Sequence, residues 1–379
     1  MAFAMKQSES FLSQLIQTRE KALGPHIVAV GGGKGGVGKS SIALMMGLCL
    51  AEKGCHTIMV DADFTGANLH GYLGVCSSKP VLSTFLKNDK LRLVDLVQPT
   101  LFKRLSVIVG SLGMNSAEGH QSYSARRLLA GLSTLPADYV ILDLGAEGSA
   151  VEIDLFLAAH TGLVISSNDS LSLHTVFNFI RAAQLRRILQ QARGQIGLRK
   201  KVSEYLRMAD TSGSIPLVQA FKRWGYEAEW VRALTQSVRP KILLNMCNGS
   251  DSCEPLQALR IEVSRLLSTR LDYWGLIHTE PLVRQAIRSF NPTLLCTENN
   301  LAFADIRRIV DRKLLQPQPP EQFVRSDQRP AGVGERSELF RGTMCSTRCL
   351  AWRSCRLRNG GLPCAMNPKE VLMREACYA

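Results

Sequence analysis

The segment GGGKGGVGKSS, residues 31–41, constrains the fold more than any other part of the sequence. It follows an apolar run that is typical of a buried strand, and it precedes an apolar helical pattern, which is the context that a phosphate-binding loop needs. Glycines let backbone N–H groups converge on phosphate oxygens, and the helix N-terminus adds a field that favours anions. Lys39 can then reach the β and γ phosphates, and the Ser40 hydroxyl can ligate Mg²⁺. The residues expected to hold the nucleotide phosphates are Gly33, Lys34, Gly35, Gly36, Val37, Gly38, Lys39, Ser40 and Ser41.

Short apolar runs alternate with longer helical patterns from His26 onward. The runs HIVAVGG, HTIMVDAD, LSVIVG, YVILDL, TGLVIS and KILLNM have the character of strands that are buried on both faces. This rhythm predicts an α/β fold, with a doubly wound, mostly parallel sheet.

The chain divides into four parts by its composition. We expect an N-terminal helix at residues 1–24 and a nucleotide-binding domain at 25–316. Within that domain, residues 181–240 lack a strong strand pattern and accumulate arginine and lysine, which predicts a basic helical insertion. A Pro-rich linker at 317–340 and a Cys-rich basic tail at 341–379 complete the chain.

The net charge of +14 favours a polyanionic partner, either an anionic membrane surface or nucleic acid. A basic surface without a dedicated partner is the alternative. The sequence has no apolar stretch near the roughly 20 residues of a membrane-spanning helix, and its first residues lack the pattern of a secretory signal. We therefore expect a cytoplasmic protein, or one that lies peripherally at the inner face of the membrane.

The loop carries a second lysine, Lys34, and so resembles the deviant Walker A motif of the MinD/ParA family of P-loop ATPases. The similarity continues in VDADFTGANLHGYLG (residues 60–74), YVILDLGAEGS (139–149), KILLNM (241–246) and WGLIHTEPLVRQAIRSFNPTL (274–294). It extends over about residues 27–315 and is nearest to the FlhG/MinD-like branch, which regulates flagellar number and placement.

This resemblance implies an ATPase that dimerises on ATP, in which Lys34 reaches the nucleotide of the partner subunit. It implies that Asp61 and Asp143 lie near Mg²⁺, that Asp63 positions the attacking water, and that Asn245 contacts the adenine. Lys34, Lys39 and Asp63 are therefore the expected catalytic residues, with ATP and Mg²⁺ as cofactors. The expected partners are a second copy of the chain and an unidentified protein, and the expected role is to position or count a cellular structure such as the flagellum.

Three features depart from the family pattern. Glu147 stands where a glycine of switch II is expected, so that hydrolysis could be slow or nearly absent. SSNDSLSLH (residues 166–174) replaces a Pro-rich segment that contacts the nucleotide. The motif DQAxxLR, which stimulates a partner GTPase in FlhG proteins, is not visible in residues 8–23.

Four cysteines of the tail fall at the spacing C-x3-C-x5-C-x8-C, namely Cys345, Cys349, Cys355 and Cys364. Four thiolates can close a zinc site or hold an iron–sulfur cluster, but the paired C-x2-C arrangement is lacking. Thiols without a metal, or a disulfide, are the alternatives. Two other functions consequently stay open: a ParA-like ATPase that binds DNA without sequence preference, and an iron–sulfur carrier of the Mrp type.

Overall fold

The computed structural model describes residues 24–64, 66, 68–75, 79–110, 118–146, 148–191, 197–211, 215–248 and 251–316. The expected N-terminal helix, the Pro-rich linker, the four tail cysteines and Glu147 lie outside these residues. Within the described part of the chain, no helix combines the length and the hydropathy needed to cross a bilayer.

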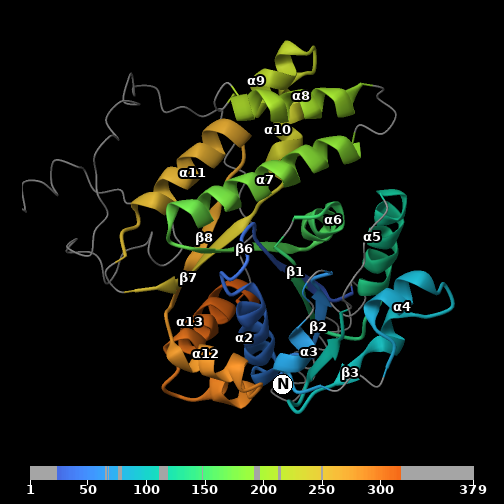
Figure 1. Cartoon of the computed structure of the whole chain (residues 1–379), viewed down its shortest axis with the longest axis vertical. Helices are drawn as coiled ribbons and strands as arrows, with labels where there is room; N and C mark the ends of the chain where they lie inside the picture. The colour runs from blue at the N-terminus through green and yellow to red at the C-terminus, as the bar shows by residue number, and fades with distance from the viewer. Residues whose placement is uncertain are drawn as a thin grey trace, which may run out of the picture.

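One eight-stranded sheet forms the centre of the fold, in the order β3-β4-β2-β5-β1-β6-β7-β8 (Figure 1). All neighbouring strands run parallel except β3, which is antiparallel to β4. The strands are β1 (His26–Gly31), β2 (Thr57–Ala62), β3 (Gln98–Pro99), β4 (Leu105–Ile108), β5 (Tyr139–Leu144), β6 (Thr161–Ser167), β7 (Lys241–Cys247) and β8 (Asp272–His278). The predicted doubly wound, mostly parallel α/β fold is confirmed.

Helices cover both faces of this sheet (Figure 1). One face is covered by α2 (Lys39–Glu52), α3 (Leu69–Tyr72), α12 (Pro281–Arg288) and α13 (Leu301–Val310). The other is covered by α4 (Leu82–Lys87), α5 (Glu118–Leu132), α6 (Ala150–Ala158), α7 (Ser170–Gln191) and α11 (Glu254–Leu267). Short turns of helix at Leu93–Leu96, Pro292–Cys296 and Asp311–Leu315 complete the two layers.

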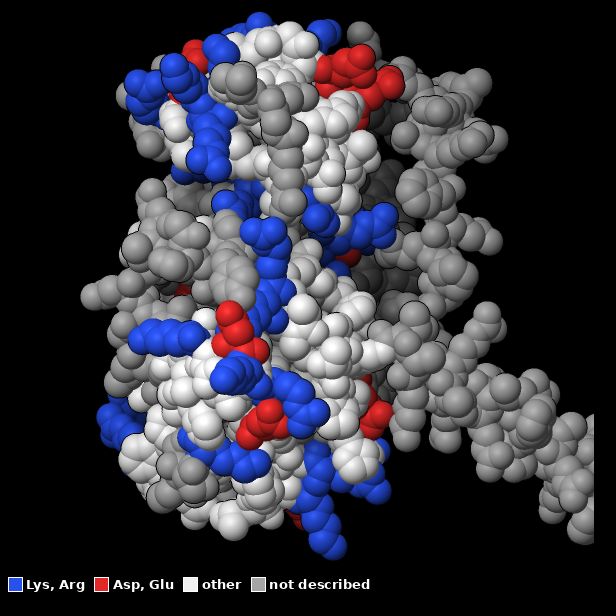
Figure 2. Space-filling model, turned by 90° about the vertical axis from the view of Figure 1, so that its right-hand side faces the viewer, with Lys and Arg blue, Asp and Glu red and all other residues white. Residues whose placement is uncertain are grey.

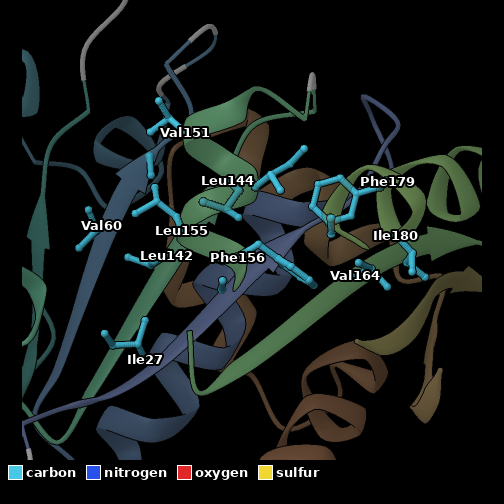
Figure 3. Close-up of a cluster of buried hydrophobic side chains, with 14 of the residues drawn as sticks. Ile27, Val60, Leu142, Leu144, Val151, Leu155, Phe156, Val164, Phe179 and Ile180 are labelled. Atoms are coloured by element: carbon cyan, nitrogen blue, oxygen red, sulfur yellow. The ribbon is translucent and has the colours of Figure 1, made fainter. Parts of the chain in front are cut away.

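Successive residues of each central strand enter opposite cores, because side chains alternate across a sheet. In β1, Ile27 and Ala29 belong to the core beneath α6 and α7, and Val28 and Val30 belong to the core beneath α2. Figure 3 shows the first of these cores, where Phe156 of α6 meets Phe179 of α7 edge to face, with 5.0 Å between the ring centroids. Strands buried on both faces explain why the sequence reads as uninterrupted apolar runs.

A helical module, which we define as α8 (Leu198–Thr211), α9 (Leu217–Arg223) and α10 (Ala228–Ser237), lies above the far end of α7 (Figure 1). The module has its own core, which includes Tyr205 of α8, Phe221 of α9 and Val231 of α10, and to which α7 contributes Leu185 and Ile188. The expected insertion at 181–240 falls on the second half of α7 and this module, and its described part contains no strand before β7 begins at Lys241.

Candidate functional site

The loop between β1 and α2 lies at the carboxyl edge of the sheet, where parallel α/β sheets bind ligands. Gly36 and Gly38 have φ values of 79° and 87°, a left-handed backbone that favours glycine. Gly33 has a different reason for being glycine, because a Cβ there would lie 2.5 Å from the backbone oxygen of Thr175 on α7. The loop is thus held against α7 on one side, and its N–H groups precede a helix of 14 residues.

Lys39 begins α2 and lies largely buried beneath the loop, where its Nζ donates a hydrogen bond to the backbone oxygen of Lys34 at 3.1 Å. Burial lowers the pKa of Lys39, whereas the charges of Asp143, Asp63 and Glu152 raise it. A buried ammonium among three carboxyl groups is a charge arrangement that a bound phosphate and a metal ion can complete.

Asp143 is the last but one residue of β5 and is buried. Burial raises the pKa of its carboxyl group to about 8, while the hydrogen bond from the Ser40 side chain and the charge of Lys39 lower it. Its Oδ1 atom has no hydrogen-bond partner among the described residues. An unpartnered buried carboxylate oxygen beside a hydroxyl of the phosphate loop is suited to a hard cation such as Mg²⁺, whose ligands are oxygens.

Asp61 is the last but one residue of β2 and lies directly opposite Asp143 in the strand register. Its two carboxylate oxygens accept hydrogen bonds from backbone N–H groups of the following loop, Oδ2 from Leu69 at 3.0 Å and Oδ1 from Asp63 at 3.4 Å. Burial raises the pKa of Asp61 to about 6, although these backbone bonds lower it. The structure therefore gives Asp61 a clear part in holding the loop, and its contact with Mg²⁺ stays a prediction.

Asp63 follows in that loop and faces the segment after β5. Its Oδ1 accepts a hydrogen bond from Gly66 N at 2.8 Å and lies 3.0 Å from the position that a Cβ of Gly145 would occupy. The two loops that carry Asp63 and Gly145 therefore meet, and the charge of Asp63 acts on Lys39. This is where a residue that positions water beside a terminal phosphate would have to lie.

Glu152 is a buried carboxylate of this site that we did not predict from the sequence. It belongs to a capping box at the start of α6, in which Ser149 N donates to Glu152 Oε2 at 2.8 Å and Glu152 N donates to Ser149 Oγ at 3.3 Å. Its other oxygen, Oε1, lies 2.2 Å from where a Cβ of Gly145 would be. The spacing Ser-x-x-Glu before an apolar run is a visible capping-box signal, and could have identified a carboxylate at this sheet edge.

Lys34 projects from the loop toward the start of α7. Its Nζ donates a hydrogen bond to Ser172 Oγ at 3.1 Å and lies 3.7 Å from Asp169 Oδ1. Asp169 also accepts hydrogen bonds from Ser167 Oγ and Ser172 Oγ, at 2.5 and 2.6 Å, and these hold the pKa of Asp169 well below its usual range. The segment that departs from the family pattern thus supplies an anionic contact for Lys34 within the same chain.

Asn245 near the end of β7 is buried against the phosphate loop. Its Nδ2 donates a hydrogen bond to the backbone oxygen of Val37 at 2.9 Å and lies 2.3 Å from the position of a Cβ on Gly38. The side chain therefore supports the loop backbone in this structure. The adenine contact implied by the family resemblance stays a prediction.

Three cysteines in the described part of the chain have thiols of low reactivity. Burial raises the pKa of the Cys49, Cys247 and Cys296 thiols to about 12, so each is a neutral thiol at physiological pH. Among the described residues, no group of three or more His, Cys, Asp or Glu side chains is placed to hold a metal ion. The metal site expected at Cys345, Cys349, Cys355 and Cys364 lies outside the described residues.

Comparisons with known proteins agree with this geometry. Residues 25–118 match the ParA family model, described as NUBPL iron-transfer P-loop NTPase. The antiactivator FleN of Pseudomonas aeruginosa is 24% identical over 155 residues, which are 41% of this chain and 55% of FleN. The iron–sulfur cluster carrier protein of Escherichia coli is 44% identical over 55 residues, which are 14% of this chain and 15% of the carrier. The match thus spans about half of FleN and far less of the carrier protein.

The cell division ATPase MinD of Pyrococcus furiosus shares the fold, with a TM-score of 0.50 at 17% identity over 76% of this chain and 98% of that chain. At this identity the likeness concerns the fold alone. The phosphate loop with its two lysines and the strand order agree with the matched family model, so that over residues 25–118 this chain is similar to the P-loop NTPases of the MinD/ParA family.

Proposed function

We propose that this protein is a cytoplasmic, Mg²⁺-dependent ATPase that dimerises on ATP and regulates the placement or number of a cellular structure such as the flagellum. The observation that carries the nucleotide site is the unpartnered Oδ1 of Asp143 beside Ser40 and Lys39. The match to the antiactivator FleN supports a regulatory role in flagellation.

The residues of the site have distinct parts in this proposal. Backbone N–H groups of residues 33–41 and the ammonium of Lys39 bind the phosphates, while Ser40 and Asp143 hold Mg²⁺ and Asp61 fixes the loop that carries Asp63. The magnesium ion, when bound, neutralises the charge that builds up on the phosphate oxygens during transfer. Asp63 positions the attacking water at the γ-phosphate.

In this proposal, the change from monomer to dimer requires Lys34 to exchange its hydrogen-bond partners. Its ammonium has a partner in its own chain, at Ser172 and Asp169, and the proposal requires that it leave them to reach the nucleotide of a second copy. A ligand shifts such an equilibrium only by its differential affinity for the two states. The γ-phosphate supplies that difference, because its charge makes it a stronger acceptor for Lys34 than the Ser172 hydroxyl and the Asp169 carboxylate.

The decisive experiment compares wild type with Lys34→Ala by light scattering, with no nucleotide, with Mg-ADP and with Mg-ATP. We expect wild type to dimerise only with Mg-ATP and Lys34→Ala to stay monomeric while it still binds ATP in calorimetry. An Arg199→Ala variant, which removes a basic side chain from the exposed surface of α8, is the matched control. Dimerisation of Lys34→Ala to the level of wild type would show that the lysine does not act across the interface.

A second candidate function is iron–sulfur cluster transfer. It is favoured by the description of the matched family model and by the short match to the Escherichia coli carrier protein. The cysteines that would hold such a cluster are those of the tail. Anaerobic purification with measurement of iron and of visible absorbance tests it, and the candidate requires that both signals disappear in a Cys345→Ser, Cys349→Ser variant.

A further inference from the structure

Three cavities lie next to one another at the edge of the sheet opposite the phosphate loop. The central cavity, of about 180 Å³, opens where β6 and β7 begin, and contacts α6, α7 and the end of α10. It shares Leu157 and Arg187 with a cavity of about 420 Å³ between α5, α6 and α7. It shares Arg239 with a third, of about 440 Å³, between α10 and the start of β8.

The lining of the central cavity is strongly basic. Its polar lining residues are His160, Arg187, Ser237, Arg239 and Lys241, and no carboxylate is among its lining residues. Figure 2 shows Lys and Arg side chains gathered across the middle of this side of the molecule, below the helical module. A concave site that collects positive charge in this way attracts anions by its summed field.

Arg187 has the feature that points most directly to a ligand. Its Nε atom is buried and has no hydrogen-bond partner among the described residues. The preceding residue, Arg186, differs sharply, because its guanidinium makes two hydrogen bonds to Asp154, at 2.7 and 2.6 Å. Buried polar groups in folded proteins are almost always satisfied, so the Nε–H of Arg187 lacks an acceptor, and a bound anion could supply one.

His160 lines the cavity and adds a hydrogen-bond donor, because its other contact defines the tautomer of the neutral ring. His160 Nδ1 accepts a hydrogen bond from Ile27 N at 3.0 Å, so in the neutral ring Nε2 carries the proton. Its ring stacks on that of His26, at 5.0 Å between centroids. The pKa of His26 is lowered to about 4 by burial and by the charges of His160 and Lys241, which indicates a positive potential at this end of β1 and β7.

We propose that the central cavity is a binding site for a phosphate group, held by the guanidinium of Arg187 together with Arg239, Lys241 and His160. A guanidinium presents N–H groups in a fork that matches phosphate oxygens, and such charge-assisted bonds are among the strongest hydrogen bonds in proteins.

The two flanking cavities extend this site. Arg126 and Arg186 line one of them, and Arg232 and Arg270 line the other. The carboxylates on their walls are Asp154 and Asp272, and each contacts an arginine of the same cavity, Arg186 and Arg270 respectively. The ligand that fits this row of three basic cavities is a soluble chain of at least three linked phosphate groups, which ADP does not have.

The test uses inorganic tripolyphosphate and isothermal titration calorimetry on the full chain without added magnesium. Wild type should bind two equivalents, one at the phosphate loop and one at the central cavity. Arg187→Gln should bind one equivalent, and an excess of ADP should displace it. Lys39→Gln should also bind one, and ADP should not displace it. If the phosphate loop does not bind nucleotide, wild type will therefore lack only the ADP-sensitive equivalent of tripolyphosphate. If the central cavity is not a phosphate site, wild type will lack only the ADP-insensitive equivalent.

An Arg199→Gln variant makes the same charge change on exposed α8 and should retain both equivalents. Arg187→Lys keeps the positive charge but lacks the forked N–H groups of the guanidinium. We expect it to weaken the ADP-insensitive binding at least tenfold. Because lysine is a conservative replacement here, such a loss would reflect the missing contact and not a defect in folding. Unchanged binding in both Arg187 variants would overturn the proposal.

Co-sedimentation with phosphatidylglycerol vesicles distinguishes a free phosphate compound from a lipid headgroup. Co-sedimentation that depends on Arg187 would support the phosphate site and identify the lipid as its source. Binding of tripolyphosphate without co-sedimentation would support the soluble ligand. Arg187-dependent binding of duplex DNA, without the ADP-insensitive equivalent of tripolyphosphate, would overturn the proposal in favour of an extended nucleic-acid surface.

Discussion

Asp61 on β2 and Asp143 on β5 stand opposite each other in register, and both carboxyl groups are buried. Burial raises both pKa values, to about 6 for Asp61 and to about 8 for Asp143, and the charge of Asp61 raises that of Asp143 further. The pair is therefore adapted to a bound metal ion and is costly to ionise without one.

This pair predicts how the stability of the nucleotide-free protein depends on pH. A carboxyl group whose pKa is raised on folding makes the folded protein bind the additional proton, so the free energy of unfolding falls as the pH rises from about 4 toward about 8. We expect the melting temperature of wild type to fall relative to that of Asp143→Asn between about pH 5.5 and about pH 8.5. Asp95→Asn changes an exposed carboxylate whose pKa is lowered, and its curve should stay parallel to that of wild type in this range.

Bound magnesium should affect the melting temperatures of wild type and Asp143→Asn in the opposite direction. Because Mg²⁺ favours the ionised carboxylate, Mg-ADP should raise the melting temperature of wild type more than that of Asp143→Asn. Differential scanning calorimetry measures both effects. Parallel pH profiles of wild type and Asp143→Asn, with equal stabilisation by Mg-ADP, would exclude Asp143 from the metal site.

The contact between Lys34 and Ser172 predicts a variant with stronger dimerisation. Ser172→Ala removes the hydrogen bond that holds Lys34 in its own chain, and should lower the dissociation constant of the Mg-ATP dimer. The Lys34 and Asp169 side chains are both partly exposed, so the effect should be within about 1 kcal/mol, or up to about fivefold. Ser203→Ala on α8, whose hydroxyl bonds the Arg199 backbone oxygen, is the matched control. Sedimentation equilibrium that shows weaker dimers for Ser172→Ala would contradict this prediction.

Gly38 and Gly54 form a natural pair for testing the phosphate loop. Both have a left-handed backbone, with φ values of 87° and 91°, so alanine should destabilise either position by about 1–2 kcal/mol. A Cβ at Gly38 would also lie 2.3 Å from Asn245 Nδ2, whereas a Cβ at Gly54 would have no atom within 4 Å. We expect Gly38→Ala to lose nucleotide binding in calorimetry and Gly54→Ala to keep it. Equal nucleotide affinities of the two variants would show that the fit between loop and Asn245 is unimportant.

Two variants of Glu152 can separate its structural role in capping α6 from its electrostatic effect on Lys39. Glu152→Ala removes half of the capping box of α6 and should cost about 1 kcal/mol in the free energy of unfolding. Glu152→Gln keeps an acceptor for Ser149 N, so it should retain most of this stability. Both variants remove a charge that raises the pKa of Lys39, and both should shift the pH dependence of ATP turnover. Turnover profiles identical to that of wild type would limit Glu152 to its capping role.

The sequence was sufficient to predict the parallel sheet, the phosphate loop and the position of Asp61 and Asp143 at strand ends, because each depends on local pattern. Apolar runs between glycines are readable without any knowledge of distant residues. The partners of Lys34 and Asn245 were not readable in this way. Ser172 is 138 residues from Lys34 and Val37 is 208 residues from Asn245, so their contacts exist only once the sheet has formed.

The departure from the family pattern at residues 166–174 illustrates the same limit. The sequence shows that the usual Pro-rich segment is missing, yet it does not show that Asp169 and Ser172 face the phosphate loop. That placement depends on β6 pairing with β1, which brings the start of α7 beside Gly33. The central basic cavity at the opposite edge depends in the same way on three separate segments meeting.

The 22 residues of α7 connect two parts of the molecule that are far apart. Its first turn touches the phosphate loop and Lys34, while Leu185 and Ile188 near its other end are built into the core of the helical module. A helix of this length is about 33 Å long, so a tilt of about 10° at the nucleotide end would move its far end by about 6 Å. A change that tilts α7 at its nucleotide end would therefore be transmitted directly to the core of the helical module.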